Sequence, residues 1–177
     1  MVNMDRLTHV KNFALNKEVG IAGKFIYDGM RDLNCAINYK DTDNIFGFLY
    51  KISVGIERLQ KIAYILLKNP TENKYQEIEK EIITHSHTGL QEKINKLTTI
   101  KLNDHQKAFL NLLTSFYNSS RYDRYNYSTQ LDDELQLFFN YVEERLKIKI
   151  EMYDFFIPQI DKKVKRFIGR VILTVVP

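Results

Sequence analysis

The sequence predicts an all-α protein, built as an antiparallel up-and-down helical bundle with additional N- and C-terminal helices. The chain of 177 residues has only 7 Gly and 3 Pro, and 44% of its residues are hydrophobic. Apolar residues recur with a 4-3-4-3 spacing between residues 45 and 66, whereas no segment alternates apolar and polar residues as a half-buried strand does. We expect one domain over residues 1–177, with its bundle core at roughly residues 40–170.

The N-terminal part predicts two helices that precede the bundle core. The two helices are expected near residues 5–18 and 23–38, with Gly20 and Gly23 around the junction and a loose apolar face from Phe25 to Ala36. Because glycine is a poor helix former, we expect a break around these two residues.

The next helix has the clearest signals in the sequence. It begins after Asp41-Thr42-Asp43, which can cap a helix N-terminus, and ends before Asn69-Pro70, where proline prevents continuation. Near its middle, Gly55 would let a facing helix approach closely. The apolar seam predicted for this helix consists of Ile45, Leu49, Ile52, Ile56, Leu59, Ala63 and Leu66.

Two helical segments follow this long helix. Residues 74–98 have helical periodicity, with an interruption expected near His87-Thr88-Gly89. Another helix begins near Asn103-Asp104 and carries apolar residues through Tyr117.

The C-terminal part predicts two more helices. One opens at Ser128, has acidic residues in its first turn that complement the helix dipole, and runs through Leu146. The last begins at Pro158, a residue suited to the first turn of a helix.

Composition and motifs argue against several classes of protein. The single cysteine, Cys35, cannot form an internal disulfide or a cysteine-based metal cluster. GxxxxGK[ST], GxGxxG, GxSxG, HExxH and the Glu-x-x-His pairs of a di-iron bundle are absent, so no cofactor is expected. Without a signal peptide, or an apolar run of the about 20 residues that a bilayer requires, we expect a cytoplasmic protein that does not engage a membrane.

His85 and His87 form the first group of candidate functional residues. An imidazole with its unperturbed pKa of about 6.5 suits proton transfer near neutral pH. Residues two apart on a helix point about 200° away from each other, so the pair would share one metal ion only if the helix breaks, which Gly89 allows. The structural alternative is that one imidazole is hydrogen-bonded inside the bundle and the other faces water.

A second group combines arginine and tyrosine. Tyr117, Arg121 and Tyr125 are four residues apart and would share one helix face. Arginine binds phosphate bidentately and tyrosine stacks on bases, a combination typical of RNA-contacting surfaces. The alternative is a helix-end network in which carboxylates such as Asp123 neutralise the arginines. The candidate nucleic-acid-binding tyrosines of this group are Tyr117, Tyr122 and Tyr125.

Two charged features remain. Glu57 and Lys61 are four residues apart, and we interpret them as a surface ion pair. The alternative is a Glu57 inside the bundle, where burial would be costly unless an arginine from another helix paired with it. The net charge of the chain is +4, and residues 145–170 contain eight basic residues against three acidic ones. That stretch is a candidate phosphate-binding face, although a solvated basic face is the commoner explanation. Its candidate nucleic-acid-binding residues are Lys162, Lys163, Lys165 and Arg166.

These motifs, taken together, resemble a bacterial branch of the HEPN superfamily, which are helical-bundle domains associated with RNA cleavage or nucleotide binding. The resemblance covers roughly residues 40–170. It implies a bundle that often dimerises, with RNA, a second copy of the chain and a cognate antitoxin or operon partner as partners. Its motifs are Gly55 to Lys61, His85-Ser86-His87, and Phe116-Tyr117 followed by Arg121 to Tyr125.

Many catalytic members of that family are metal-independent ribonucleases with an Arg-x(4–6)-His motif at a dimer interface, and no arginine here has a histidine in that window. Catalysis would therefore need a composite site. In such a site His85 or His87 would take the 2′-hydroxyl proton, and Arg121 or Arg124 would stabilise the charged phosphate. The resemblance implies a protein that binds or cleaves RNA, in bacterial defence or a toxin–antitoxin setting. The alternative is a non-catalytic helical module for dimerisation or partner binding.

Overall fold

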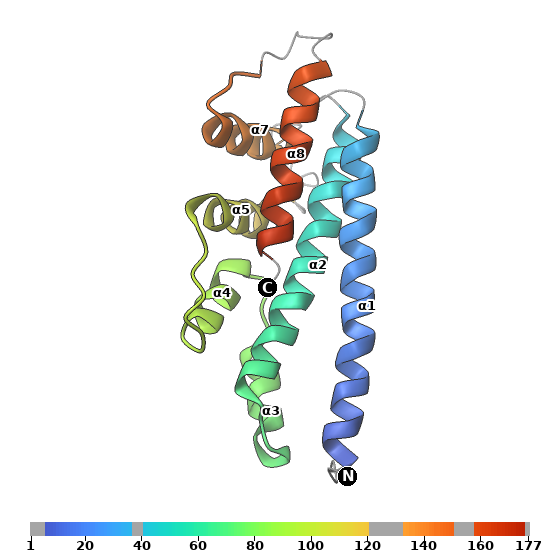
Figure 1. The fold of residues 1–177 in the computed structure, drawn as a ribbon, viewed down its shortest axis with the longest axis vertical. Coiled ribbons are helices and arrows are strands. Elements are labelled where there is room, and N and C mark those ends of the chain that lie inside the picture. The colour runs from blue at the N-terminus through green and yellow to red at the C-terminus, as the bar shows by residue number, and fades with distance from the viewer. Residues whose placement is uncertain (1–5, 37–40, 121–132, 151–157, 176–177) are drawn as a thin grey trace.

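The structure, a computed structural model, describes residues 6–36, 41–120, 133–150 and 158–175. Every regular element in these ranges is helical, which confirms the predicted all-α bundle. Figure 1 shows α1 and α2 as a long antiparallel pair, with shorter helices stacked along α2. The elements are α1 (Arg6–Cys35), α2 (Thr42–Lys68), α3 (Glu72–Glu81), α4 (His87–Asn95), α5 (Asp104–Ser115), the short π-helix η1 (Phe116–Ser120), α7 (Asp133–Leu146) and α8 (Pro158–Val175).

The first helix, α1, is continuous, so the prediction of two helices broken around Gly20 and Gly23 is wrong. A glycine inside a helix costs only about 1 kcal/mol relative to alanine. Packing on α2 offsets this cost, because α1 lies against α2 through Leu15, Ala22 and Gly29, buried residues at seven-residue intervals.

The bounds of α2 agree with the prediction. The side chain of Asp41 caps its N-terminus, and Asn69 ends the helix in the left-handed conformation, with φ of 40°. A Cβ on Gly55 would lie 3.1 Å from the carbonyl oxygen of Ala22 in α1. The close helix approach predicted at Gly55 is therefore confirmed.

The apolar seam predicted along α2 holds only for its first half. Ile45, Leu49, Ile52 and Ile56 are buried, whereas Leu66 is exposed. Leu59 and Ala63 are only partly buried. The prediction is wrong beyond Ile56 because polar residues occupy much of the buried face there.

The segment predicted as residues 74–98 forms two helices, α3 and α4, and the break precedes His87 instead of falling on His87-Thr88-Gly89. Ser86 caps α4, since its hydroxyl accepts a hydrogen bond from the backbone N–H of Gly89 at 3.0 Å. Serine is among the best N-cap residues, so this contact explains why α4 starts at His87.

The later helices agree with the prediction wherever the structure describes them. Asn103 and Gln106 form a capping box before α5, and α8 starts at Pro158. The helix expected from Ser128 is described from Asp133 onward as α7, and its earlier part lies outside the described residues.

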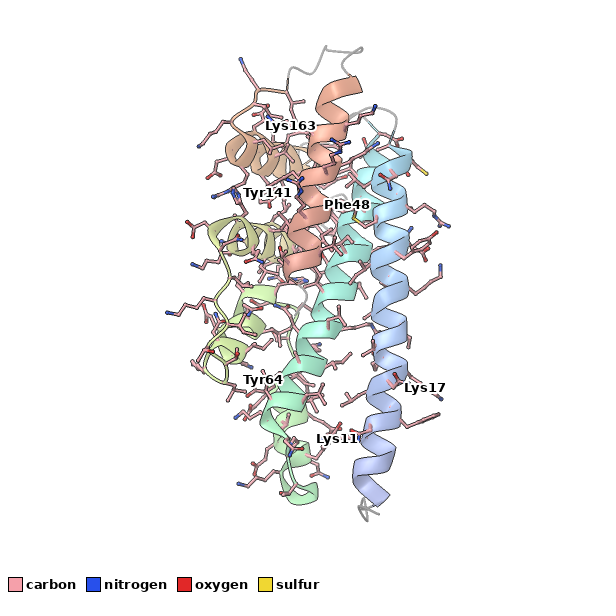
Figure 2. The ribbon with its side chains drawn as sticks, viewed as in Figure 1. Lys11, Lys17, Phe48, Tyr64, Tyr141 and Lys163 are labelled. Carbon is pink, nitrogen blue, oxygen red and sulfur yellow. The ribbon has the colours of Figure 1, made fainter. Side chains whose placement is uncertain are left out.

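The main apolar core lies where α2 meets α5, α7 and α8. Phe48 of α2 is fully buried there, and its ring meets that of Phe138 edge to face, with centroids 5.7 Å apart. Figure 2 shows Phe48 among the side chains around the first half of α2. A smaller cluster around Ile62 and Ile65 joins the other end of α2 to α1, α3 and α4. Within the described ranges, no helix combines the length and the apolar character needed to cross a membrane.

Candidate functional site

A stripe of four polar residues lies on the buried face of α2. These residues, Ser53, Glu57, Gln60 and Tyr64, are spaced 4-3-4 and are all buried, and we call them the polar stripe. Each contacts a residue of the segment 81–87, which leads from α3 into α4. The polar stripe therefore holds this segment, with its two histidines, against α2.

His85 rests on a buried carboxylate. Its Nδ1 lies 3.0 Å from Oε2 of Glu57, and the other carboxylate oxygen accepts a hydrogen bond from Nζ of Lys61 at 2.7 Å. The side chain of Glu57 is 10% exposed, whereas that of His85 is 57% exposed. Because a carboxylate only accepts, Nδ1 carries a proton and Nε2 of the neutral ring presents a lone pair.

Tyr117 packs its ring against both histidines. The ring centroids of Tyr117 and His85 lie 4.8 Å apart, and those of Tyr117 and His87 lie 6.5 Å apart. Tyr117 is buried and belongs to η1, a kind of element that occurs often at functional sites. Its ring and the Glu57 carboxylate together restrict the orientation of the His85 imidazole. Glu57, Lys61, His85 and Tyr117 are called the His85 site below.

His87 is buried and has a structural partner. Its Nε2 donates to the carbonyl oxygen of Ser53 at 2.9 Å, and its own carbonyl oxygen accepts from Nε2 of Gln60 at 3.0 Å. Nδ1 has no hydrogen-bonding partner in the described part of the chain. Burial lowers the pKa of His87, so the ring is neutral near pH 7. The two histidines thus have the arrangement of the structural alternative, one inside the bundle and one facing water.

The interpretation of Glu57 and Lys61 as a surface ion pair is wrong. The Glu57 side chain is buried and pairs with Lys61 and His85 together. A signal for this was present in the sequence, because the 4-3-4 spacing of polar residues repeats the spacing of the apolar seam. Ser53 and Gln60, which sequence reasoning also missed, belong to the same pattern.

Four predicted site residues, Arg121, Tyr122, Arg124 and Tyr125, lie outside the described residues. Arg121 comes directly after Ser120, the last residue of η1, and is therefore close in the chain to Tyr117 of the His85 site. Tyr117 is described, and its ring is buried against the histidines instead of forming an open surface for a base.

The four basic candidates of α8 have two different environments. Lys162, Lys163 and Arg166 are exposed; Figure 2 labels Lys163 on the N-terminal half of α8. The ammonium group of Lys165 donates instead to the carbonyl oxygens of Asn34 and Ala36, at 3.1 and 3.3 Å. A cation stabilises these C-terminal carbonyls of α1, so the structure gives Lys165 a helix-capping role.

The groups of the His85 site favour proton-transfer chemistry. A carboxylate neutralised by one lysine orients an exposed imidazole, the arrangement that general acid–base catalysis uses. In the part of the chain that the structure describes, no three His, Cys, Asp or Glu residues are grouped so that they could hold a metal ion.

Comparisons with protein-family models, curated proteins and solved structures find no match to this chain.

The buried His87 is expected to make folding stability depend on pH. Its pKa is lowered in the folded protein by burial, whereas in the unfolded chain it titrates near the ordinary value of about 6.5. Below about pH 6.5 the unfolded state therefore binds more protons than the folded state. As the pH decreases through this range, His87 lowers the free energy of unfolding by at most about 1.4 kcal/mol per pH unit.

Urea unfolding between about pH 5 and pH 8 checks this expectation. The variant His87→Gln should lose part of the slope that the wild type has below neutral pH. The matched variant His105→Gln removes an exposed histidine and should keep that slope. An unchanged slope in His87→Gln would contradict the assignment.

Proposed function

We propose that this chain is a HEPN-like protein that binds RNA and cleaves it with His85 as the general base. The observation that carries the proposal is the His85–Glu57 contact, in which a buried carboxylate holds Nδ1 of a histidine whose side chain is 57% exposed. His87 is less suited to act as a general base, because its ring is buried and its Nε2 is hydrogen-bonded to the carbonyl oxygen of Ser53. We therefore assign the catalytic role to His85 alone.

The proposed reaction uses the neighbouring 2′-hydroxyl of the RNA as its nucleophile. Nε2 of His85 takes the 2′-hydroxyl proton, the 2′-oxygen bonds to the adjacent phosphorus, and the bond from phosphorus to the 5′-oxygen breaks. The departing 5′-oxygen takes a proton from water, and the hydroxide that remains takes the proton back from Nε2 of His85. The products are a 2′,3′-cyclic phosphate and a 5′-hydroxyl end. Glu57 stabilises the imidazolium that forms, because one of its oxygens already faces Nδ1.

A cation near the phosphate would stabilise the negative charge that develops there. Arg121 and Arg124 are the candidates for this role. Arg121 comes directly after η1 in the chain and Arg124 three residues later, and Tyr117 of η1 lies against His85. The proposal therefore assigns the proton transfer to His85 and the stabilisation of the phosphate charge to Arg121 or Arg124.

RNA binding draws further support from the charge of the chain. Lys162, Lys163 and Arg166 are exposed on α8, and the whole chain has a net charge of +4. Basic side chains that neutralise phosphates release counterions, so binding should weaken steeply as salt rises. A role in bacterial defence or with a cognate antitoxin rests on the sequence resemblance and belongs to the same proposal.

The test is cleavage of a labelled single-stranded RNA by the purified protein in the presence of EDTA. We expect cleavage that leaves 2′,3′-cyclic phosphate ends, and we expect His85→Ala to lower its rate by about 10²- to 10⁴-fold. The control is His105→Ala, which removes an exposed histidine of α5 and should leave the rate unchanged.

Two results would contradict the proposal. One is a rate that neither His85→Ala nor Arg121→Ala changes, since a contaminating nuclease would then explain the cleavage. The other is an RNA that binds in a salt-dependent manner and remains intact, which would support a binding protein and remove the catalytic role of His85.

A further inference from the structure

Three polar atoms, on the polar stripe and on His87, are buried without a hydrogen-bonding partner among the residues that the structure describes. They are Oγ of Ser53, Oε1 of Gln60 and Nδ1 of His87. Ser53 and His87 are fully buried, and Gln60 is 3% exposed. Because an unpaired polar atom destabilises the folded state, buried atoms of this kind are almost always hydrogen-bonded in proteins. These atoms therefore indicate a ligand that supplies hydrogen bonds.

Contacts of His87 keep the three atoms in one neighbourhood. The ring Nε2 donates to the carbonyl oxygen of Ser53, so the unpaired hydroxyl belongs to a residue that the ring contacts. The carbonyl oxygen of His87 accepts from Nε2 of Gln60, and Oε1 belongs to the same planar amide group. Ser53 and Gln60 lie in α2, and His87 is the first residue of α4. The three atoms therefore lie where the polar stripe meets the start of α4.

Together the three atoms require two hydrogen-bond donors and provide one. The proton of the neutral His87 ring is on Nε2, so Nδ1 has a lone pair and only accepts. The amide nitrogen of Gln60 donates to His87 and, at 3.2 Å, to Oε1 of Gln91, so the amide oxygen of Gln60 is also an acceptor. The hydroxyl of Ser53 can donate as well as accept. A matching ligand has two donor hydrogens and at least one lone pair.

We propose that these three atoms bind an internal water molecule between the polar stripe and α4. Water has two donor hydrogens and two lone pairs, and a buried water typically makes about three hydrogen bonds to polar groups that would otherwise be unpaired. Here it donates to Nδ1 of His87 and to Oε1 of Gln60, and it accepts from the hydroxyl of Ser53. Serine has the smallest side chain of the polar stripe, so the most room for a water is beside it.

The proposed water joins two positions of the polar stripe, seven residues apart, to the first residue of α4. His85 lies two residues before His87, so the water also helps to hold the segment that presents His85. The water site is independent of the proposed cleavage of RNA, because hydrogen-bonding requirements alone define it.

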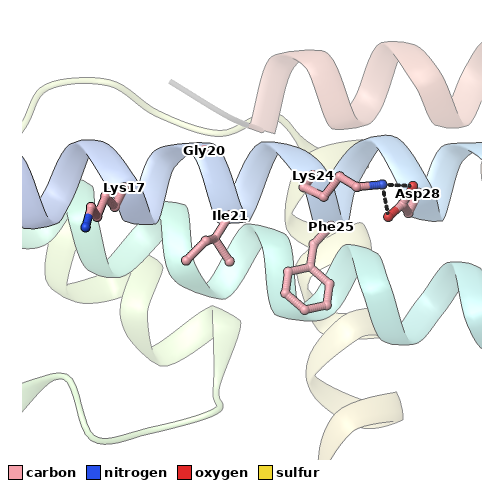
Figure 3. A pocket seen from close by; sticks show the side chains of 6 residues that line it. All are labelled: Lys17, Gly20, Ile21, Lys24, Phe25 and Asp28. Carbon is pink, nitrogen blue, oxygen red and sulfur yellow. Dashed lines mark hydrogen bonds and ion pairs between the residues drawn. The ribbon is translucent and has the colours of Figure 1, made fainter.

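A groove on the outer face of α1, of about 540 Å³, has the opposite character. Figure 3 shows that Lys24 and Asp28, in its lining, are paired with each other, and their charged groups are 2.6 Å apart. Lys24 is also 67% exposed, so solvent reaches this groove freely. We therefore expect a long-lived water beside His87 and only exchanging solvent in the groove.

Nuclear magnetic resonance of the protein with isotope-labelled histidine and glycine tests the water site at neutral pH. Hε1 of His87, the ring proton between the two nitrogens, should show a negative nuclear Overhauser effect with water, the sign that a rigidly held molecule gives. Two controls lie in the same sample, Hε1 of the exposed His105 and the α-protons of Gly20 in the groove. Both should show only the weak effect of rapidly exchanging surface water.

Three results of this experiment would overturn the proposal. The first is the absence of a negative effect at His87, which would mean that another part of the chain supplies the donors. The second is a His87 signal that changes when EDTA is added, which would assign the site to a metal ion. The third is loss of the effect in Ser53→Ala, because an exchanging hydroxyl hydrogen would then be its source. The proposed water keeps its contacts with His87 and Gln60 in that variant.

Urea unfolding of Ser53→Ala gives a second, independent measurement. If Oγ were simply unpaired, its removal would raise the midpoint, because a buried polar atom is lost and alanine is a better helix former than serine. With the water bound, the variant removes one of its hydrogen bonds, and we expect the midpoint to fall. Asn111→Ala is the matched variant, since Asn111 is exposed on α5 and gains helix propensity alone; its midpoint should rise. A midpoint that rises in Ser53→Ala as well would overturn the proposal.

Discussion

Replacing Phe48 with alanine is expected to lower the free energy of unfolding by about 3–5 kcal/mol. Phe48 is fully buried, and its ring contacts that of Phe138, so its removal leaves a cavity where α2 meets α7. Urea unfolding followed by far-ultraviolet circular dichroism measures the loss.

The matched variant for Phe48→Ala is Leu173→Ala, which truncates a side chain that is 79% exposed on α8. It should change the unfolding free energy by no more than about 0.5 kcal/mol. If both variants lost the same small amount, the position of Phe48 in the core would be wrong.

Replacing Gly55 with leucine is expected to lower the free energy of unfolding by about 1–3 kcal/mol, or more if α1 cannot shift. A Cβ at this position would lie 2.7 Å from Cγ1 of Ile26 and 3.1 Å from the backbone oxygen of Ala22. The Ile26 side chain can move, but the backbone of α1 moves only if the whole helix does. The cost therefore exceeds the gain in helix propensity.

Gly23→Leu is the matched variant for Gly55→Leu, and it should have the opposite sign. Gly23 lies inside α1, and nothing lies within 4 Å of the position that its Cβ would take. Leucine there gains helix propensity, so stability should rise by about 0.5–1 kcal/mol. A loss of stability in both variants would show that the close approach of α1 and α2 is not what distinguishes the two glycines.

Helix bounds are predictable from this sequence where the signal is local. The side chains of Asp41 and Asn103 accept hydrogen bonds from backbone N–H groups three residues later. The ring of Pro158 fixes its own φ at a value that suits the start of a helix. Gly20 and Gly23 are different, because α1 continues through them only with the support of α2. That support comes from residues such as Ile62, far away in the sequence, and no local pattern reports it.

The candidate site is predictable only in part, for a similar physical reason. His85 and His87 are recognisable by residue type, but the partner that distinguishes His85 is Glu57, 28 residues earlier. On its own face of α2, Glu57 has Lys61 four residues later as an ion-pair partner, and no local pattern identifies the partner from another segment as His85. The Glu57 carboxylate becomes buried only when the segment 81–87 folds back onto the polar stripe, so its burial cannot be predicted from α2 alone.

The polar stripe also makes the length of α2 a functional quantity. One residue inserted between Ser53 and Glu57 would rotate everything after it by about 100° relative to the first half of the helix. Phe48 would keep its place in the core, whereas Glu57 would turn away from His85. The number of residues between Phe48 and Glu57 therefore determines whether the Glu57 carboxylate points toward His85 when Phe48 is packed in the core.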